Sequence, residues 1–192
     1  LNIGHKAAKG EFITWTSDDN FFAPTALENM VFSLVKEKAD LVFANFAIVN
    51  EKGEEIDQYR FNPETSILLE NIVRACFLYK KDVFKCNGGY DEELFKIEDY
   101  AFLLMASFNL NIYHLPKKIY YYRKHAESLT ANKTISKFKY ERNYVQKVEE
   151  MYFKFFEKWN IRQPQKMASV FGSLHLFFSG ISSNKPSYSS CK

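Results

Sequence analysis

The sequence predicts an α/β domain over about the first 130 residues, and three observations support this class. Short apolar segments typical of strands alternate with segments whose apolar residues recur at helical spacing. With 192 residues and 46% hydrophobic content, the chain can hold one good-sized domain, with or without a helical appendage. Clusters of polar side chains fall at the ends of the predicted elements, where open α/β sheets gather their ligands.

The N-terminal part begins as a helix that ends at Gly10, because glycine suits the residue that follows a helix. Residues 11–15 then form a short apolar strand. In residues 24–38, five apolar side chains recur at helical spacing and predict an amphipathic helix with one buried face. These side chains are Leu27, Met30, Val31, Leu34 and Val35.

The middle of the chain reads as two strands, a helix and a third strand. Residues 41–49 are a second apolar strand, and the Asn and Gly of residues 50–53 predict a turn. Residues 54–61 return as an edge strand or a loop. Residues 66–74 are expected to form a short helix, and residues 76–79 a short strand.

The last part of the α/β pattern contains a loop, a helix and two strands. Residues 88–92 begin with two glycines, which free the backbone for a tight loop. A helix is expected over residues 98–109. Residues 111–115 and 118–123 predict two strands that Pro116 separates.

The pattern changes after the last strand. Residues 138–159 predict a long basic and aromatic helix packed on the rest of the protein, and residues 163–180 a second helix. We therefore divide the chain into a catalytic domain at 1–131, a helical extension at 132–181 and a flexible, serine-rich tail at 182–192.

Charge and composition exclude several classes of protein. A net charge of +3 falls short of the basic load expected of a nucleic-acid binder. Cys76, Cys86 and Cys191 lack any C-x-x-C spacing, which argues against a zinc cluster or a disulfide framework and favours a reducing cytoplasm. The longest weakly polar run, residues 169–181, is shorter than a membrane-spanning helix, and no signal peptide is recognisable.

The acidic pair Asp18-Asp19 follows the first strand and precedes a helix. Two adjacent carboxylates repel each other unless a cation, a helix N-terminus or solvent offsets their charge. Taken alone, the pair is as consistent with capping of the helix as with binding of a divalent metal.

Two further polar clusters lie at the ends of predicted elements. Glu98-Asp99 begins a helix, where capping is again the simpler interpretation of the pair in isolation. Arg123, His125 and Ser128 follow the last strand. One acidic pair can bind a metal that neutralises a diphosphate, the other can supply a general base, and Arg with His can hold phosphate oxygens or complete the metal shell. This division suits group transfer from a nucleotide-activated donor.

The order and spacing of five segments resemble the inverting family-two glycosyltransferases of the GT-A fold. The segments are Asn2-Ile3-Gly4 with Ala8-Lys9-Gly10, residues 12–20, Gly88-Gly89-Tyr90-Asp91-Glu92, Glu98-Asp99-Tyr100 and residues 122–128. The resemblance covers about residues 2–130 and implies a mixed sheet flanked by helices.

The resemblance also implies a role for each site residue. Asp19 would coordinate Mn²⁺ or Mg²⁺ at the diphosphate of a nucleotide-sugar donor, expected to be a UDP-sugar, and Asp18 would lie near the ribose or donor sugar. Asp99 would be the general base, with Glu98 as its catalytic neighbour. His125 corresponds to a position that reaches the metal in some relatives. Arg123 and Ser128 belong to the loop that covers the diphosphate.

Three departures from the family pattern qualify these roles. Thr16 stands where many relatives carry a further carboxylate, which weakens the role of Asp18 more than that of Asp19. No Gln-x-x-Arg-Trp motif of the processive synthases is present, which favours transfer of single sugars. The family's first strands, which hold the nucleotide, are expected before residue 1, so these 192 residues alone are expected to bind a nucleotide sugar poorly.

The resemblance implies an enzyme of surface-polysaccharide or glycolipid synthesis that acts on a carbohydrate or glycolipid acceptor. We expect it in the cytoplasm or at the inner face of the cell membrane, and peripheral membrane contact through the C-terminal helices is a further hypothesis. The alternative is a non-catalytic fragment that binds a nucleotide sugar or a carbohydrate.

Overall fold

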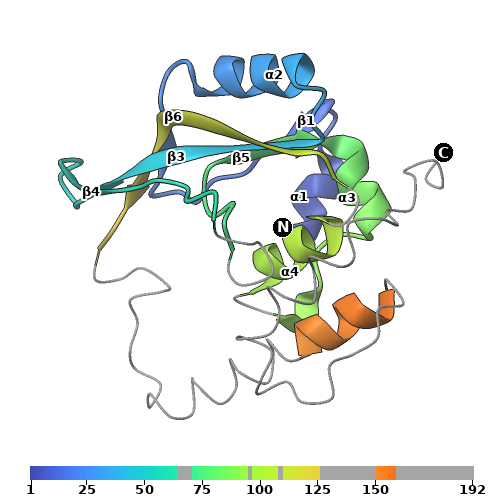
Figure 1. Ribbon diagram of the computed structural model, residues 1–192. Coiled ribbons are helices and arrows are strands. Elements are labelled where there is room, and N and C mark those ends of the chain that lie inside the picture. Colours follow the sequence, from blue (N-terminus) through green and yellow to red (C-terminus); the bar gives the residue numbers. More distant parts are fainter. Residues whose placement is uncertain (65–70, 95–96, 108–109, 126–149, 159–192) are drawn as a thin grey trace, which may run out of the picture.

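A computed structural model describes residues 1–64, 71–94, 97–107, 110–125 and 150–158 (Figure 1). Six strands form one sheet: β1 (Phe12–Ile13), β2 (Phe21–Phe22), β3 (Leu41–Val49), β4 (Glu55–Tyr59), β5 (Phe77–Lys80) and β6 (Ile112–Arg123). The helices are α1 (Asn2–Ala7), α2 (Ala26–Lys36), α3 (Lys81–Asn87) and α4 (Glu98–Ser107), with a 3₁₀ turn at Glu92–Leu94 and a further helix over 150–158. The α/β class predicted from the sequence is confirmed.

Strand β3 is the centre of a mixed sheet. The strand order is β1-β5-β3-β6-β2, and β4 also pairs with β3. β3 is antiparallel to β4 and β5 but parallel to β6. Seven of its nine residues are buried, as the apolar run at 41–49 predicted.

Helices cover both faces of the sheet (Figure 1). α2 lies on one face, where Met30 and Leu34 pack with Val42 and Tyr120. α1, α3 and α4 lie on the other face. The predicted amphipathic helix is confirmed, but its buried stripe is narrower than expected, because Leu27 and Val35 are exposed.

A third apolar cluster fastens the helix over 150–158 to α4. Met151, Tyr152, Phe155 and Phe156 are buried against residues of α4 and of the turn before it. The expected helix over 138–159 is thus confirmed for 150–158, and the rest of it, like the second helix and the tail, lies outside the described residues. Within the described ranges, no helix combines the length and the apolar character that a membrane crossing requires.

Several predicted elements were wrong in detail. The two strands expected around Pro116 are one strand, β6, because the register shifts beside this residue leave its missing N–H outside the ladder. Residues 71–74 of the expected short helix are not helical, and 65–70 lie outside the described part. β2 was missed because two residues carry no periodic signal. α3 was missed although it ends at Gly88, whose φ of 83° gives the left-handed cap.

The packing of α2 on the sheet predicts the cost of a cavity. Leu34 is 1% exposed, so Leu34→Ala should lower the free energy of unfolding by about 2–5 kcal/mol. Leu27→Ala is the matched control on the same helix, since Leu27 is 49% exposed, and should cost less than about 1 kcal/mol. Urea unfolding measures both, and equal losses would contradict the placement of α2.

Candidate functional site

The end of β6 meets two other loops, and Arg123 joins them. Its Nε donates to the carbonyl of Asp19 at 3.0 Å, and its Nη1 donates to the carbonyls of Asn50 and Glu51 at 3.2 and 2.5 Å. Its backbone N–H donates to Asn20 Oδ1 at 2.7 Å. Arg123 therefore fixes the acidic-pair loop against the turn between β3 and β4. The sequence had predicted only a position in the loop that covers the diphosphate, not this structural role.

Asp19 and His125 are in direct contact. His125 Nε2 lies 2.9 Å from Asp19 Oδ2, and both side chains are partly buried. Burial alone would raise the pKa of Asp19, but hydrogen bonds with His125, Ser17 and the backbone of Asp19, together with the charge of His125, outweigh this, so the pKa lies below its usual value. The carboxylate is thus held in its ionised form, the form that binds a cation.

The other oxygen of Asp19 is unsatisfied. Among the described residues, Asp19 Oδ1 is buried without a hydrogen-bond partner. A buried carboxylate oxygen in this state calls for a ligand, and an ion or water molecule is the usual explanation. Asp19 and His125 offer the oxygen and imidazole nitrogen that Mn²⁺ accepts, so this pair fits the expected metal. No set of three or more His, Cys, Asp or Glu side chains that could hold a metal occurs in the described ranges.

The remaining residues expected near the donor lie differently. Asp18 is exposed, whereas Asp19 is partly buried, so the two carboxylates of the pair occupy different environments. Ser128 lies outside the described residues.

The second acidic pair begins α4 and is more deeply enclosed. Burial has the largest effect on the pKa of Asp99 and raises it. The hydrogen bond from the N–H of Tyr100 lowers this pKa, and the negative charge of Glu98 raises it further. Asn71 Nδ2 lies 3.4 Å from Asp99 Oδ2, a long contact that the sequence analysis missed. Glu98 Oε2 is buried without a hydrogen-bond partner among the described residues, like Asp19 Oδ1.

Tyr90 lies between the two acidic pairs. Its hydroxyl accepts a hydrogen bond of 3.2 Å from Trp15 Nε1, in the loop of the first pair. Burial raises the pKa of Tyr90, and the charges of Asp99 and Glu98 raise it further, which places the hydroxyl within electrostatic reach of the second pair. Tyr90 was recognised only as part of a loop motif, since its partner Trp15 is 75 residues away in sequence.

The loop that carries Tyr90 is held from two sides. Gly88 and Gly89 have φ values of 83° and 87°, in the left-handed region that favours glycine. On one side, the side-chain amide of Asn2 donates to the carbonyl of Tyr90 and accepts from its N–H, both at 2.8 Å. On the other, Lys154 pairs with Asp91 at 2.7 Å, a contact that raises the pKa of the lysine.

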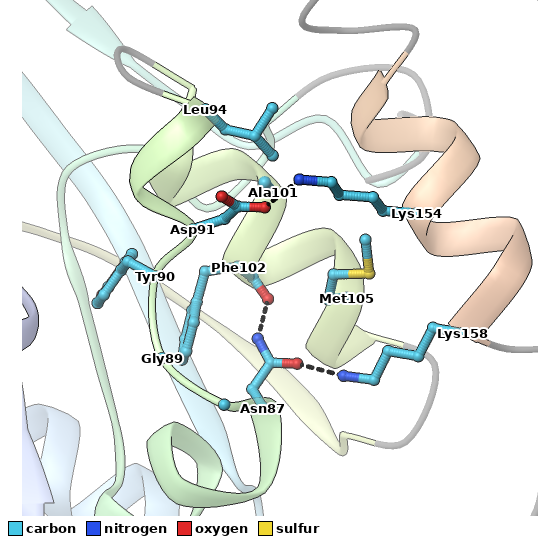
Figure 2. Close-up of a pocket in the computed structure, with 11 residues that line it drawn as sticks. Asn87, Gly89, Tyr90, Asp91, Leu94, Ala101, Phe102, Met105, Lys154 and Lys158 are labelled. Carbon is cyan, nitrogen blue, oxygen red and sulfur yellow. Dashed lines mark hydrogen bonds and ion pairs between the residues drawn. The ribbon is translucent and has the colours of Figure 1, made fainter.

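A cavity of about 340 Å³ is lined by this loop, α4 and two lysines of the helix over 150–158 (Figure 2). Lys154 spans it to reach Asp91, and Lys158 reaches Asn87, whose amide in turn donates to the carbonyl of Phe102 in α4. The helix over 150–158 thus braces the loop and α4 together.

A model of the family described as Glycosyl transferase family 2 matches residues 1–97, half of the chain. The chain belongs to glycosyl transferase family 2. The matched segment includes Asp18 and Asp19 and ends directly before Glu98.

Relatives and solved structures agree with this family. An uncharacterized glycosyltransferase of Rickettsia typhi is 26% identical over 94% of this chain, and one of Haemophilus influenzae is 30% identical over 54%. The chain spans 57% of the length of the Rickettsia relative. The structure of S. aureus TarS 1-349 in complex with UDP-GlcNAc has 21% identity and a TM-score of 0.61, and covers 81% of this chain and 45% of TarS 1-349. This likeness confirms the expected GT-A-like fold class.

The side-chain hydrogen bonds of Arg123 predict that replacing it with lysine makes this family-two protein less stable. Arg123→Lys keeps the charge but loses the fork that reaches three carbonyls, so it should lower the free energy of unfolding by about 1–3 kcal/mol. Arg60→Lys, the same change at an exposed arginine, should stay within about 0.5 kcal/mol. Urea unfolding of both variants checks this, and equal stability would show that the fork is not needed.

Proposed function

We propose that the protein transfers a single sugar from a nucleotide-diphosphate donor to a hydroxyl group, with inversion at the anomeric carbon. The observation that carries the proposal is the location of the two buried carboxylate oxygens without a hydrogen-bond partner. Among the described residues these are Asp19 Oδ1 and Glu98 Oε2, one in each acidic pair. Unsatisfied buried carboxylates are costly to stability, and a site that binds a cation and a hydroxyl substrate accounts for both.

Asp19 and His125 would hold the divalent metal. When bound, Mn²⁺ or Mg²⁺ would neutralise the negative charge of the donor diphosphate and of the leaving nucleoside diphosphate. Arg123 would keep the Asp19 loop in place through its bond to the Asp19 carbonyl.

Asp99 would act as the general base. Its carboxylate takes the proton of the acceptor hydroxyl while the hydroxyl oxygen forms a bond to the anomeric carbon. The bond from that carbon to the diphosphate oxygen breaks, and its electron pair leaves with the nucleoside diphosphate. Burial suits Asp99 to this role, because a raised pKa makes a carboxylate a stronger base.

The donor and the pathway follow from similarity rather than from the site. TarS was solved with UDP-GlcNAc, which supports a UDP-sugar as the donor to be tried first. A carbohydrate or glycolipid acceptor, a role in surface-polysaccharide synthesis and a location at the inner face of the membrane stay predictions from the family resemblance.

Asp99→Asn tests the base. In an assay of Mn²⁺-dependent release of nucleoside diphosphate from UDP-sugars, kcat should fall by about 10²–10⁴-fold, since the amide cannot accept the proton. Asp57→Asn changes an exposed carboxylate on β4 and should leave kcat unchanged. Equal rates for Asp99→Asn and the unchanged protein would exclude Asp99 as the base, whereas no release by the unchanged protein would favour the non-catalytic binding alternative.

The pH dependence of the reaction offers an independent test. A base works only when ionised, and a raised pKa means that Asp99 loses its proton at a higher pH than an ordinary aspartate. Lowering the pH should therefore reduce kcat/KM through a limb that lies above the usual aspartate pKa. The profile of kcat/KM against pH measures this, and a flat profile down to pH values near 4 would contradict it.

A further inference from the structure

Four side chains form a continuous network beside the site: the buried Tyr90, Tyr79 and His5, and the partly buried Trp15. Trp15 Nε1 lies 3.2 Å from the Tyr90 hydroxyl, which lies 3.1 Å from the Tyr79 hydroxyl. The Tyr79 hydroxyl lies 2.7 Å from His5 Nε2. We call this the tyrosine network. It connects α1, β5, the Gly88-Gly89 loop and the loop of the first acidic pair.

The direction of each hydrogen bond in the tyrosine network follows from its two ends. His5 Nδ1 lies 2.9 Å from the carbonyl of Leu1, which can only accept, so the hydrogen of neutral His5 is on Nδ1. Nε2 is then an acceptor, and Tyr79 donates to it. At the other end, the indole of Trp15 can only donate, so Tyr90 accepts from Trp15 and donates to Tyr79.

The tyrosine network keeps this direction because its members stay uncharged. Burial lowers the pKa of His5 and raises the pKa of Tyr79 and of Tyr90. The rings are also fixed by packing, since His5 stacks on Phe84 and Tyr90 stacks on Phe102 of α4. Each hydroxyl in the network therefore has one donor and one acceptor at fixed positions.

Tyr90 is the member that faces both halves of the site. Trp15 precedes the Asp18-Asp19 pair by three residues in the same loop. The ring of Tyr90 is stacked on α4 with centroids 4.5 Å apart, and Asp99 lies in the first turn of this helix. In Figure 2, Tyr90 points away from Lys154 and Lys158, toward the side of the loop opposite the bracing helix.

We propose that Tyr90 is a positioning residue whose hydroxyl sets the distance between the acidic-pair loop and the helix that carries Asp99. The inference rests on the proposed function, because it assigns the donor to one half of the site and the base to the other. Tyr90 touches neither substrate nor metal in this role. It acts through Trp15 on one side and through its stacking on α4 on the other.

Tyr90→Phe tests the proposal, because it keeps the stacked ring and removes only the hydroxyl. Amide hydrogen exchange in residues 15–20 should become faster, since Trp15 loses its acceptor. In the release assay kcat should fall by roughly tenfold or more, because small misplacements of reacting groups are costly, while KM for the donor stays within about twofold. Tyr59→Phe is the matched control: it removes a tyrosine hydroxyl that donates to the Ile72 carbonyl at 2.9 Å, outside the tyrosine network, and should change neither readout.

A second variant keeps the test decisive if Tyr90→Phe does not fold. Trp15→Phe removes the same hydrogen bond from its other end and should produce the same faster exchange and lower kcat. Where both variants fold, the loss of the double variant should be smaller than the product of the two single losses, because the Trp15–Tyr90 bond is removed only once. Unchanged exchange in residues 15–20 in the variant that folds, or multiplied losses in the double variant, would overturn the proposal. Exchange is read without substrate, so it decides the role of Tyr90 even if the protein shows no sugar transfer.

Discussion

The parallel pairing of β3 with β6 is the interaction on which the rest of the structure depends. It sets Val49 opposite Arg123 and brings the N–H of Lys124 to the carbonyl of Val49 at 2.9 Å. On its other edge β6 pairs with β2, which directly follows the acidic-pair loop. The end of one strand thus lies between two loops that are about 30 residues apart in sequence, and the Arg123 fork and the Asp19–His125 contact follow from this placement.

The two acidic pairs show how one residue type acquires opposite properties. At Asp19, burial is outweighed by several hydrogen bonds, of which the one with His125 has the largest effect, and the pKa is lowered; at Asp99, burial and the charge of Glu98 raise the pKa. Carboxylates whose environments push their pKa values apart are suited to different tasks. An ionised Asp19 suits a cation, and a more basic Asp99 suits proton transfer, so the division of roles that the sequence only suggested has a physical basis in the fold.

Local signals in the sequence predicted much of this protein. The apolar run of β3, the helical spacing in α2 and the acidic pairs at element ends are all visible within a few neighbouring residues, and each lies where it was expected. Contacts between distant residues could not be found in this way. Three contacts join residues more than 70 positions apart: the Arg123 fork, the hydrogen bonds between Asn2 and Tyr90, and the Trp15–Tyr90 bond. Such contacts depend on the strand order, which no local periodicity specifies.

The irregular stretch of β6 has a consequence for how such a chain can change over evolutionary time. Between the pairs Ala44–Leu115 and Val49–Arg123, β6 takes eight steps where β3 takes five. The surplus residues, which include Pro116, are placed at the register shifts and carry no regular ladder bonds. Separate ladder pairs hold residues 121–123, so we expect a residue gained or lost in the irregular stretch to leave this part of the register in place. The length of β6 can therefore change in its irregular stretch while Arg123, at the end of the strand, stays opposite Val49.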